Sequence, residues 1–155
     1  GLQTGNYPVA MSHTRGPGDG NKRKAIKTRF GALMVHEIRT RPESKLDRKL
    51  LDAMIDFGYG RDDCRVYNYW DRNAPIRPSD DRIKWLLLKH NGQLMILLAT
   101  WNPDPASARL RLDTDMLDVQ PQSAVDMETG ESLPFDGSEL KLELERYGIR
   151  LITLE

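Results

Sequence analysis

The chain has 155 residues, of which 39% are hydrophobic and 30% charged, a composition too apolar for a disordered protein and sufficient for one or two folded units. No apolar run approaches the ~18 residues of a membrane-spanning helix, so we expect no membrane partner. The single cysteine excludes an internal disulfide and a cysteine-only zinc site.

The formal net charge is zero, but opposite charges occupy the two ends of the sequence. Residues 1–50 contain 11 Lys and Arg against 4 Asp and Glu, whereas residues 103–155 contain 5 basic against 12 acidic residues. The two ends are expected either to attract one another or to lie in different surroundings. The cations of the basic third are spread out and have no aromatic residues between them, so we expect no nucleic-acid partner.

Residues 1–23 are expected to form a loop or arm, because the run 16–21 contains three glycines and a proline. This run lacks the Gly-Lys-Ser/Thr ending of a phosphate-binding loop, which favours a flexible connector. Gly1 is a residue that tag cleavage commonly leaves, and no targeting segment follows it. We therefore expect the chain to be one domain of a longer protein, for which a secreted or periplasmic localisation is left open.

A two-helix segment, either a helical hairpin or a connector, is expected over residues 24–60. Residues 24–39 carry apolar side chains at helical spacing, and Glu37 falls within the apolar stripe. A carboxylate on an apolar face can serve an enzyme as a general acid. The alternative is a structural role, in a pair with Arg41 or at the end of the helix, and we favour that alternative.

The second helix is expected over residues 45–57. Ser44 and Asp47 have the spacing of a capping box at its beginning, and Gly58 is expected to end it. Pro42 separates the two helices. This helix has a wide apolar face, which indicates contact with more than one neighbour.

Short runs of alternating or apolar residues predict an antiparallel β-sandwich of about seven strands over residues 61–155, so the expected fold class is mainly β. Asn91-Gly92, between two apolar runs, is typical of a tight hairpin. Trp85 and Trp101 lie inside these apolar runs and are expected in the core. The expected strands cover residues 64–70, 83–89, 94–101, 108–113, 123–127, 140–145 and 149–154.

No catalytic or metal-binding pattern is complete in the sequence. The three histidines are far from one another, and His36-Glu37 lacks the second histidine of a zinc-protease helix. The carboxylate pairs Asp62-Asp63 and Asp80-Asp81 stand beside arginines and predict solvated ion pairs. We therefore expect no catalytic residue, no metal and no cofactor in this chain, and an independent hydrolase would depend on Glu37 alone.

The aromatic residues at the end of the first expected strand form the candidate binding site. Tyr69 and Trp70 are followed by Asp71 and Arg72. Sugar rings stack on aromatic faces, and carboxylate and guanidinium groups bind sugar hydroxyls. The four residues therefore predict a carbohydrate subsite. The alternative, which we favour, is that the rings pack the sandwich or its contact with the helices.

Four segments resemble the C-terminal β-sandwich that follows the (β/α)8 barrel in many bacterial glycoside hydrolases. They carry a hairpin that ends in an Asn loop, a strand that ends in Asp-Met-Glu-Thr-Gly, and a closing Tyr-Gly-Ile-Arg-Leu strand; they are residues 66–70, 83–102, 124–131 and 147–151. The resemblance implies that residues 24–57 are the last helical segment of the barrel or a connector to the sandwich. It also implies that the catalytic carboxylates lie in a barrel that this chain lacks.

Two functions of different classes follow. The first, which we favour, is a non-catalytic C-terminal module of a carbohydrate-active enzyme that packs on and stabilises an upstream catalytic barrel. Its partner is then that barrel, and the parent protein is a candidate glycoside hydrolase. The second is an autonomous module that binds carbohydrate or protein through the platform of Tyr69 and Trp70.

Overall fold

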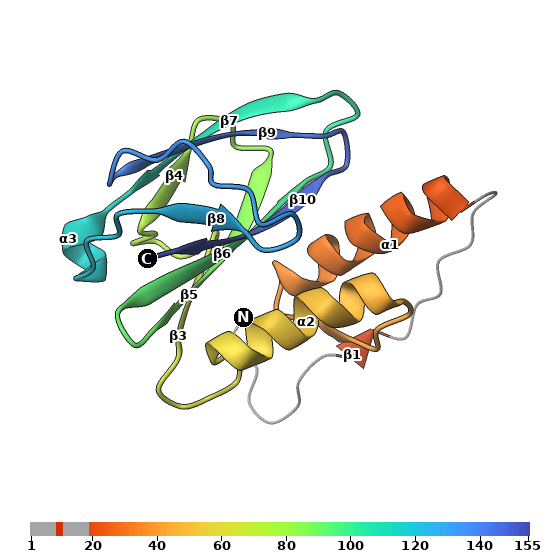
Figure 1. Cartoon of the computed structure of the whole chain (residues 1–155), viewed down its shortest axis with the longest axis horizontal. Coiled ribbons are helices and arrows are strands. Elements are labelled where there is room, and N and C mark those ends of the chain that lie inside the picture. Colours follow the sequence, from red (N-terminus) through yellow and green to blue (C-terminus); the bar gives the residue numbers. More distant parts are fainter. Residues whose placement is uncertain (1–8, 11–18) are drawn as a thin grey trace.

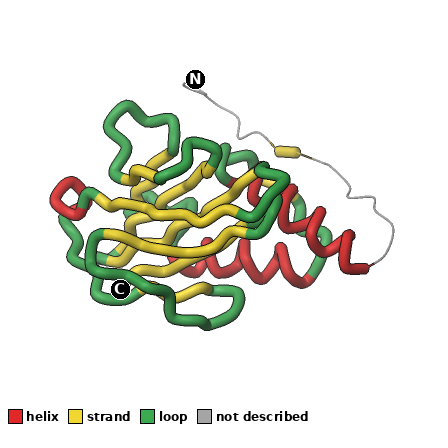
Figure 2. Tube along the Cα trace, turned by 90° about the horizontal axis from the view of Figure 1, so that it is seen from above, coloured by secondary structure: helices red, strands yellow, loops and turns green. Residues whose placement is uncertain are grey.

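The computed structural model describes residues 9–10 and 19–155, and most of the arm expected over residues 1–23 lies outside these ranges. The described residues form three layers, in which a five-stranded sheet lies between a three-stranded sheet and two helices (Figures 1 and 2). Both sheets are antiparallel, which confirms the expected mainly β class with a two-helix segment before the sandwich.

The strand order of each sheet defines the sandwich. The five-stranded sheet has the order β3 (Arg65–Asn68), β5 (Ile83–His90), β6 (Gln93–Thr100), β10 (Ile149–Leu154) and β8 (Ala124–Asp126). The three-stranded sheet has the order β4 (Ile76–Pro78), β7 (Ala106–Leu112) and β9 (Glu139–Leu144). A short helix, α3 (Thr114–Leu117), follows β7.

The hairpin of β5 and β6 forms the centre of the five-stranded sheet. Its turn residues Asn91 and Gly92 have φ values of 49° and 76°, as the tight hairpin predicted from the sequence requires. The strands pair over their whole length, from Ile83 opposite Thr100 to His90 opposite Gln93. Because both faces of the sheet are covered, these strands are apolar on both sides.

Alternate residues of the central strands enter two separate cores. Trp85, Leu87 and Ile96 are among those that face the three-stranded sheet. Leu86 and Leu97 are among those that face the helices. Each buried side chain of this size contributes about 1.5–3 kcal/mol relative to an exposed one.

Helix α2 (Lys45–Phe57) begins and ends as the sequence predicts. The Ser44 hydroxyl accepts from the backbone N–H of Asp47, and the Asp47 carboxylate accepts from the backbone N–H of Ser44, so the capping box is present. At the other end Gly58, with φ of 129°, donates its N–H to the carbonyls of Met54 and Ile55.

Helix α1 (Asp19–Met34) differs from the helix expected over residues 24–39. It begins five residues earlier, so residues 19–23 are helical and not part of a loop. It also ends five residues earlier, in a Schellman motif whose left-handed residue is Glu37 (φ 55°). The N–H of Ile38 donates to the carbonyl of Leu33, and that of Glu37 to the carbonyl of Met34. The placement of Glu37 on a helical stripe was therefore wrong, because the helix has already ended.

A small parallel sheet precedes α2. β1 (Val9–Ala10) pairs with β2 (Arg39–Thr40), and α1 connects the two strands. This strand–helix–strand unit was not predicted from the sequence. Among the described helices, none combines the length and the apolar character that crossing a bilayer requires.

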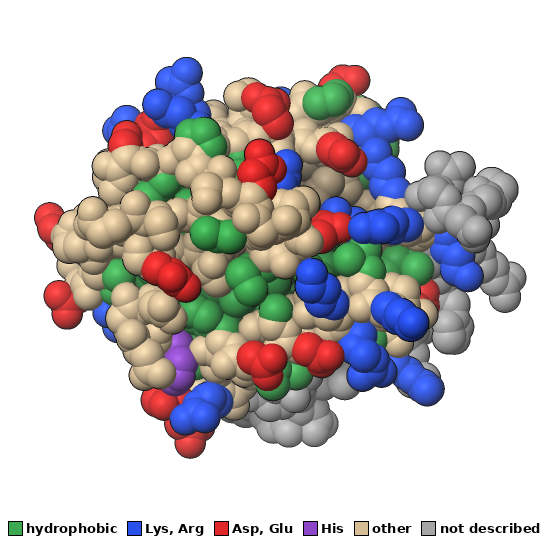
Figure 3. Space-filling view, viewed as in Figure 1, with side chains coloured by type: hydrophobic (Ala, Val, Ile, Leu, Met, Phe, Trp, Pro, Cys, Tyr) green, Lys and Arg blue, Asp and Glu red, His purple; other side chains and the backbone are tan. Residues whose placement is uncertain are grey.

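The basic beginning and the acidic end of the sequence meet in the fold. Lys and Arg side chains gather over the two helices on the face shown in Figure 3. Two of them, Arg23 and Lys27 on α1, form ion pairs of 3.0 and 2.6 Å with Glu128 in the turn after β8. Of the two alternatives that the charge distribution left open, attraction between the ends is the one observed.

Candidate functional site

Four aromatic side chains from three segments meet at the end of α1. We call His36, Tyr69, Trp70 and Trp101 the aromatic cluster. The His36 ring is stacked on that of Trp70, with centroids 5.9 Å apart and planes inclined by 18°, and its centroid is 6.1 Å from that of Trp101. The rings of Tyr69 and Trp70 are edge to face, with centroids 4.8 Å apart. His36 therefore lies at the centre of the cluster.

Hydrogen bonds fix the orientation of His36. Its Nδ1 is 2.7 Å from the carbonyl oxygen of Ala32, and its Nε2 is 2.8 Å from the Tyr69 hydroxyl. A carbonyl oxygen only accepts, so Nδ1 donates its proton to Ala32, while Nε2 and the Tyr69 hydroxyl share the second hydrogen bond. The Lys84 ammonium lies 5.0 Å from the centre of the Tyr69 ring, a cation–π contact. Tyr69 is thus held on both sides.

Two indole rings of the cluster are open to solvent. Trp70 is 48% exposed and Trp101 37% exposed. The expectation that Trp101 lies in the core was wrong, because β6 ends at Thr100 and the indole lies beyond the sheet. Trp85, which is 2% exposed, lies in the core as expected. The two indoles therefore offer an aromatic surface that the core does not use, whereas Tyr69 packs against the core between the sheets.

Of the four residues predicted as a sugar subsite, only Tyr69 and Trp70 belong to the aromatic cluster. The Asp71 carboxylate accepts from the backbone N–H of Asn68 at 2.8 Å, and the Asp71 N–H donates to the Asn68 carbonyl. Asp71 therefore closes the turn after β3. Arg72 is exposed and has no ion pair with a described residue.

Glu37 connects the end of α1 to the sheet. Its Oε2 accepts from the Nδ2 of Asn68 at 3.0 Å. Asn68 is buried, and its Oδ1 has no hydrogen-bond partner among the described residues. This contact gives Glu37 a structural role at the helix end, with Asn68 as its partner.

One carboxylate of each pair predicted from the sequence, Asp63 and Asp80, forms an ion pair at the surface, as expected. Asp63 pairs with Arg61 at 2.9 Å, and Asp80 pairs with Arg82 at 2.7 Å. The hydrogen bond from the Arg82 side chain lowers the pKa of Asp80 to about 2. Across residues 9–10 and 19–155, no group of three His, Cys, Asp or Glu side chains has an arrangement that could hold a metal ion.

A comparison with protein-family profiles shows the family to which the chain belongs. The profile of the C-terminal domain of glycoside hydrolase 123 matches residues 48–131, more than half of the chain. The chain belongs to this family. The expected relationship to a glycoside hydrolase C-terminal sandwich is thereby confirmed. No curated protein sequence matches the chain.

Solved structures of glycoside hydrolases share the fold of this glycoside hydrolase 123 C-terminal domain. A GH27 β-L-arabinopyranosidase from Geobacillus stearothermophilus, crystallised with arabinose, is 13% identical with a TM-score of 0.54, over 85% of this chain and 30% of that one. An Anoxybacillus α-amylase is 8% identical with a TM-score of 0.56, over 86% and 33%. The maltogenic α-amylase AmyB of Thermotoga neapolitana is 12% identical with a TM-score of 0.53, over 86% and 37%.

These comparisons extend beyond the sandwich. The chain spans about a third of the length of these enzymes. The similarity covers 85% of the chain, which is a larger share than residues 61–155 make up. The similarity of fold therefore includes part of the helical segment.

Proposed function

We propose that this glycoside hydrolase 123 C-terminal domain is a non-catalytic module that packs on a (β/α)8 catalytic barrel and stabilises it. The observation that carries the proposal is the order β1, α1, β2, α2 at the beginning of the described chain, with β1 parallel to β2. Strand–helix repeats with parallel neighbouring strands are the units from which such a barrel is built.

The parallel pair is too small to stand alone. Each strand has two residues, and among the described residues no third strand joins either edge. Parallel sheets are found almost only where helices cover them, and isolated two-stranded pairs are marginal in water. Further strands at both edges of this pair would satisfy its backbone groups, and a barrel supplies them. The two units from β1 to α2 would then be the last of that barrel.

The sandwich has a surface suited to covering these helices. Phe30 and Met34 of α1, and Leu50 and Met54 of α2, are buried against the five-stranded sheet. The sheet therefore provides an apolar outer layer for two barrel helices, while Ile55 of α2 remains 50% exposed. Burial of this kind supports a stabilising function.

The position of the aromatic cluster supports a function outside the active site. His36 lies three residues before β2, so the cluster is at the amino end of that strand. Active sites of (β/α)8 barrels lie at the carboxyl ends of the strands. In such a barrel the cluster would be on the opposite side from the substrate.

The packing proposal is tested by truncating the parent protein after residue 60. We expect the truncated protein to be insoluble or to unfold at a lower temperature, because α1 and α2 lose their outer cover. A truncated protein with the melting temperature and activity of the intact one would contradict the proposal.

The second candidate function is carbohydrate binding by the aromatic cluster, and the exposure of Trp70 and Trp101 favours it. On a glycan array, the intact chain should bind a glycan that the Trp70→Ala variant does not bind. Met116→Ala is the matched control, since Met116 is an exposed apolar side chain on α3. An intact, folded chain that binds no glycan would rule this candidate out.

A further inference from the structure

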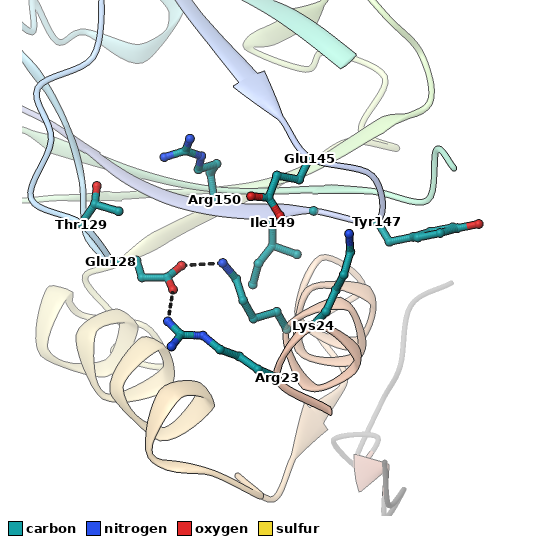
Figure 4. A pocket seen from close by; sticks show the side chains of 10 residues that line it. Arg23, Lys24, Glu128, Thr129, Glu145, Tyr147, Ile149 and Arg150 are labelled. Carbon is teal, nitrogen blue, oxygen red and sulfur yellow. Dashed lines mark hydrogen bonds and ion pairs between the residues drawn. The ribbon is translucent and has the colours of Figure 1, made fainter. Parts of the chain in front are cut away.

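An open, apolar groove of about 480 Å³ lies beside α1, on the side of the helix that faces away from α2. Ala25 and Thr28 of α1 line it, together with Tyr147 from the turn that precedes β10; Lys24 and Arg29 complete the lining. Figure 4 shows the Tyr147 ring extending past α1 in this direction. No function discussed above uses the groove.

Tyr147 is held in place by its backbone. Its φ of 52° lies in the left-handed region that bulky side chains rarely adopt. Its N–H donates to the carbonyl of Asn102 at 2.9 Å, and its carbonyl accepts from the Thr28 hydroxyl at 2.8 Å. The ring is 40% exposed. A strained turn that presents an aromatic ring to solvent indicates a contact for which the ring is needed.

The groove lies at one end of a row of exposed rings. Tyr147 precedes β10, Trp101 directly follows β6, and Trp70 lies two residues beyond β3. Because β6 is antiparallel to β10 and to β5, and β5 to β3, these strand ends share one edge of the five-stranded sheet. Helix α1 runs along this edge, since Thr28 contacts Tyr147 and His36, just beyond the helix, contacts Trp70. Exposed aromatic residues that gather in this way are typical of a protein contact.

The geometry of a (β/α)8 barrel fixes which element would lie on this side of α1. The helices of such a barrel stand side by side, in chain order, around the strands. α2 covers one side of α1, so the helix that precedes β1 belongs on the other side, where the groove is. Neighbouring helices pack with their axes about 8–10 Å apart, and small side chains such as Ala25 and Thr28 permit this approach.

We propose that Tyr147 docks the barrel helix that precedes β1, so that the sandwich contacts a further helix of the barrel besides α1 and α2. The partner is an amphipathic helix whose apolar stripe packs on Ala25, Thr28 and the Tyr147 ring. Lys24 at the groove has no ion pair with a described residue, so a carboxylate on the partner helix would complement it. This inference rests on the proposed packing function and names a contact that the function itself does not require.

Site-specific photo-cross-linking in the parent protein tests the proposal. Benzoylphenylalanine replaces one residue at a time: Tyr147 at the groove, Ile55 on the exposed side of α2, and Arg109 on the outer face of the three-stranded sheet. Mass spectrometry then identifies the attached segments. Residue 147 should cross-link to a segment upstream of β1 whose apolar residues recur at helical spacing. Residue 55 should cross-link to other parts of the barrel, and residue 109 to none of them.

Tyr147→Asn gives an independent measurement, because asparagine tolerates the left-handed backbone but lacks the ring. It should lower the melting temperature of the parent protein by a few degrees, and that of the 155-residue chain by less, because only the parent buries the ring against the upstream helix. Tyr147→Phe keeps the ring and is the matched control, which should leave both melting temperatures unchanged.

The proposal is overturned if residue 147 cross-links to no upstream helix while residue 55 does reach the barrel, and the packing function then stands. It is also overturned if residue 147 cross-links to a second copy of the chain, or if Tyr147→Asn lowers the two melting temperatures equally. If neither residue 147 nor residue 55 cross-links to the barrel, the packing function fails as well. The failure of this inference is therefore distinguishable from that of the packing function.

Discussion

Gly31 of α1 approaches Ile149 of β10 so closely that a Cβ atom at residue 31 would lie 2.2 Å from the Cγ2 of Ile149. It would also lie 3.2 Å from the Cβ of Ala99 on β6. The helix therefore contacts the five-stranded sheet through its bare backbone at this point. This single missing side chain sets how near the helix layer can come to the sheet.

Gly31→Ala is expected to destabilise the chain by about 1–3 kcal/mol, because overpacking outweighs the gain in helix propensity. Urea unfolding followed by circular dichroism measures the change. A double-mutant cycle with Ile149→Ala provides the control: the penalty at residue 31 should shrink once the Cγ2 of Ile149 is removed. An unfolding midpoint that does not fall in Gly31→Ala would contradict the close contact.

The pair of Asp126 and Arg150 should make the free energy of unfolding fall at acidic pH. Burial alone would raise the pKa of Asp126, but hydrogen bonds from Arg150 and from the N–H groups of Thr129 and Glu128 outweigh it and lower the pKa. The folded state therefore favours the ionised carboxylate. Its contribution is complete above the pKa of the unfolded chain, about 3.9, and is lost as the pH falls through the lower folded value.

Asp126→Asn should lower the free energy of unfolding by about 2 kcal/mol at neutral pH, because the partly buried Arg150 loses its charged partner. The difference from the unmodified chain should narrow as the pH is lowered toward 2. Asp80→Asn, at a surface ion pair with Arg82, is the comparison and should cost less. Equal losses at the two positions would show that burial of Asp126 is unimportant.

The beginning of α2 depends on Asp47. Its fully buried carboxylate accepts from the backbone N–H groups of Glu43 and Ser44, and from Arg29 at 3.1 Å. Asp47→Ala leaves the two backbone donors without their acceptor and removes one of the two carboxylates beside Arg29, so it should cost about 3 kcal/mol. Ser44→Ala removes only the other half of the box and should cost about 1 kcal/mol. Thermal unfolding should rank the two variants in this order, and the reverse order would contradict the geometry.

Glu128 is expected to hold α1 against the sandwich. Glu128→Gln weakens its ion pairs with Arg23 and Lys27 and should cost about 1 kcal/mol, since the pairs are only partly buried. Hydrogen exchange should become faster in the first half of α1 and remain unchanged in α2. Glu131→Gln, an exposed residue of the same turn, is the control. Equal exchange in both variants would argue against this role.

The sequence predicted the elements that carry a strong local signal. Asn91-Gly92 located the central hairpin, and Ser44 with Asp47 located the start of α2. The end of α1 was missed because its left-handed residue is Glu37, where a glycine would have been recognisable. The parallel pair was missed for a different reason. Two-residue strands have no periodicity, and their pairing depends on contacts between residues thirty positions apart.

The aromatic cluster was only half predictable. Tyr69 and Trp70 are adjacent in the sequence, so their proximity was evident. His36 comes from another segment, and no local pattern indicates that its ring reaches Trp70. Trp101 carried a signal that was overlooked: Pro103 stands two residues later, and proline commonly marks the end of a strand.

The alternation along β5, β6 and β10 has a consequence for how the molecule comes apart. Leu86 and Leu87 are neighbours on one strand, yet they contribute to different cores. If the helices left the sheet, one apolar face of these strands would be exposed to water. The other face of the same strands forms the core of the sandwich. We therefore expect helices and sandwich to melt in one cooperative transition, with calorimetric and van't Hoff enthalpies in agreement. The chain changes from helices to strands near residue 60, but the two segments are expected to unfold together.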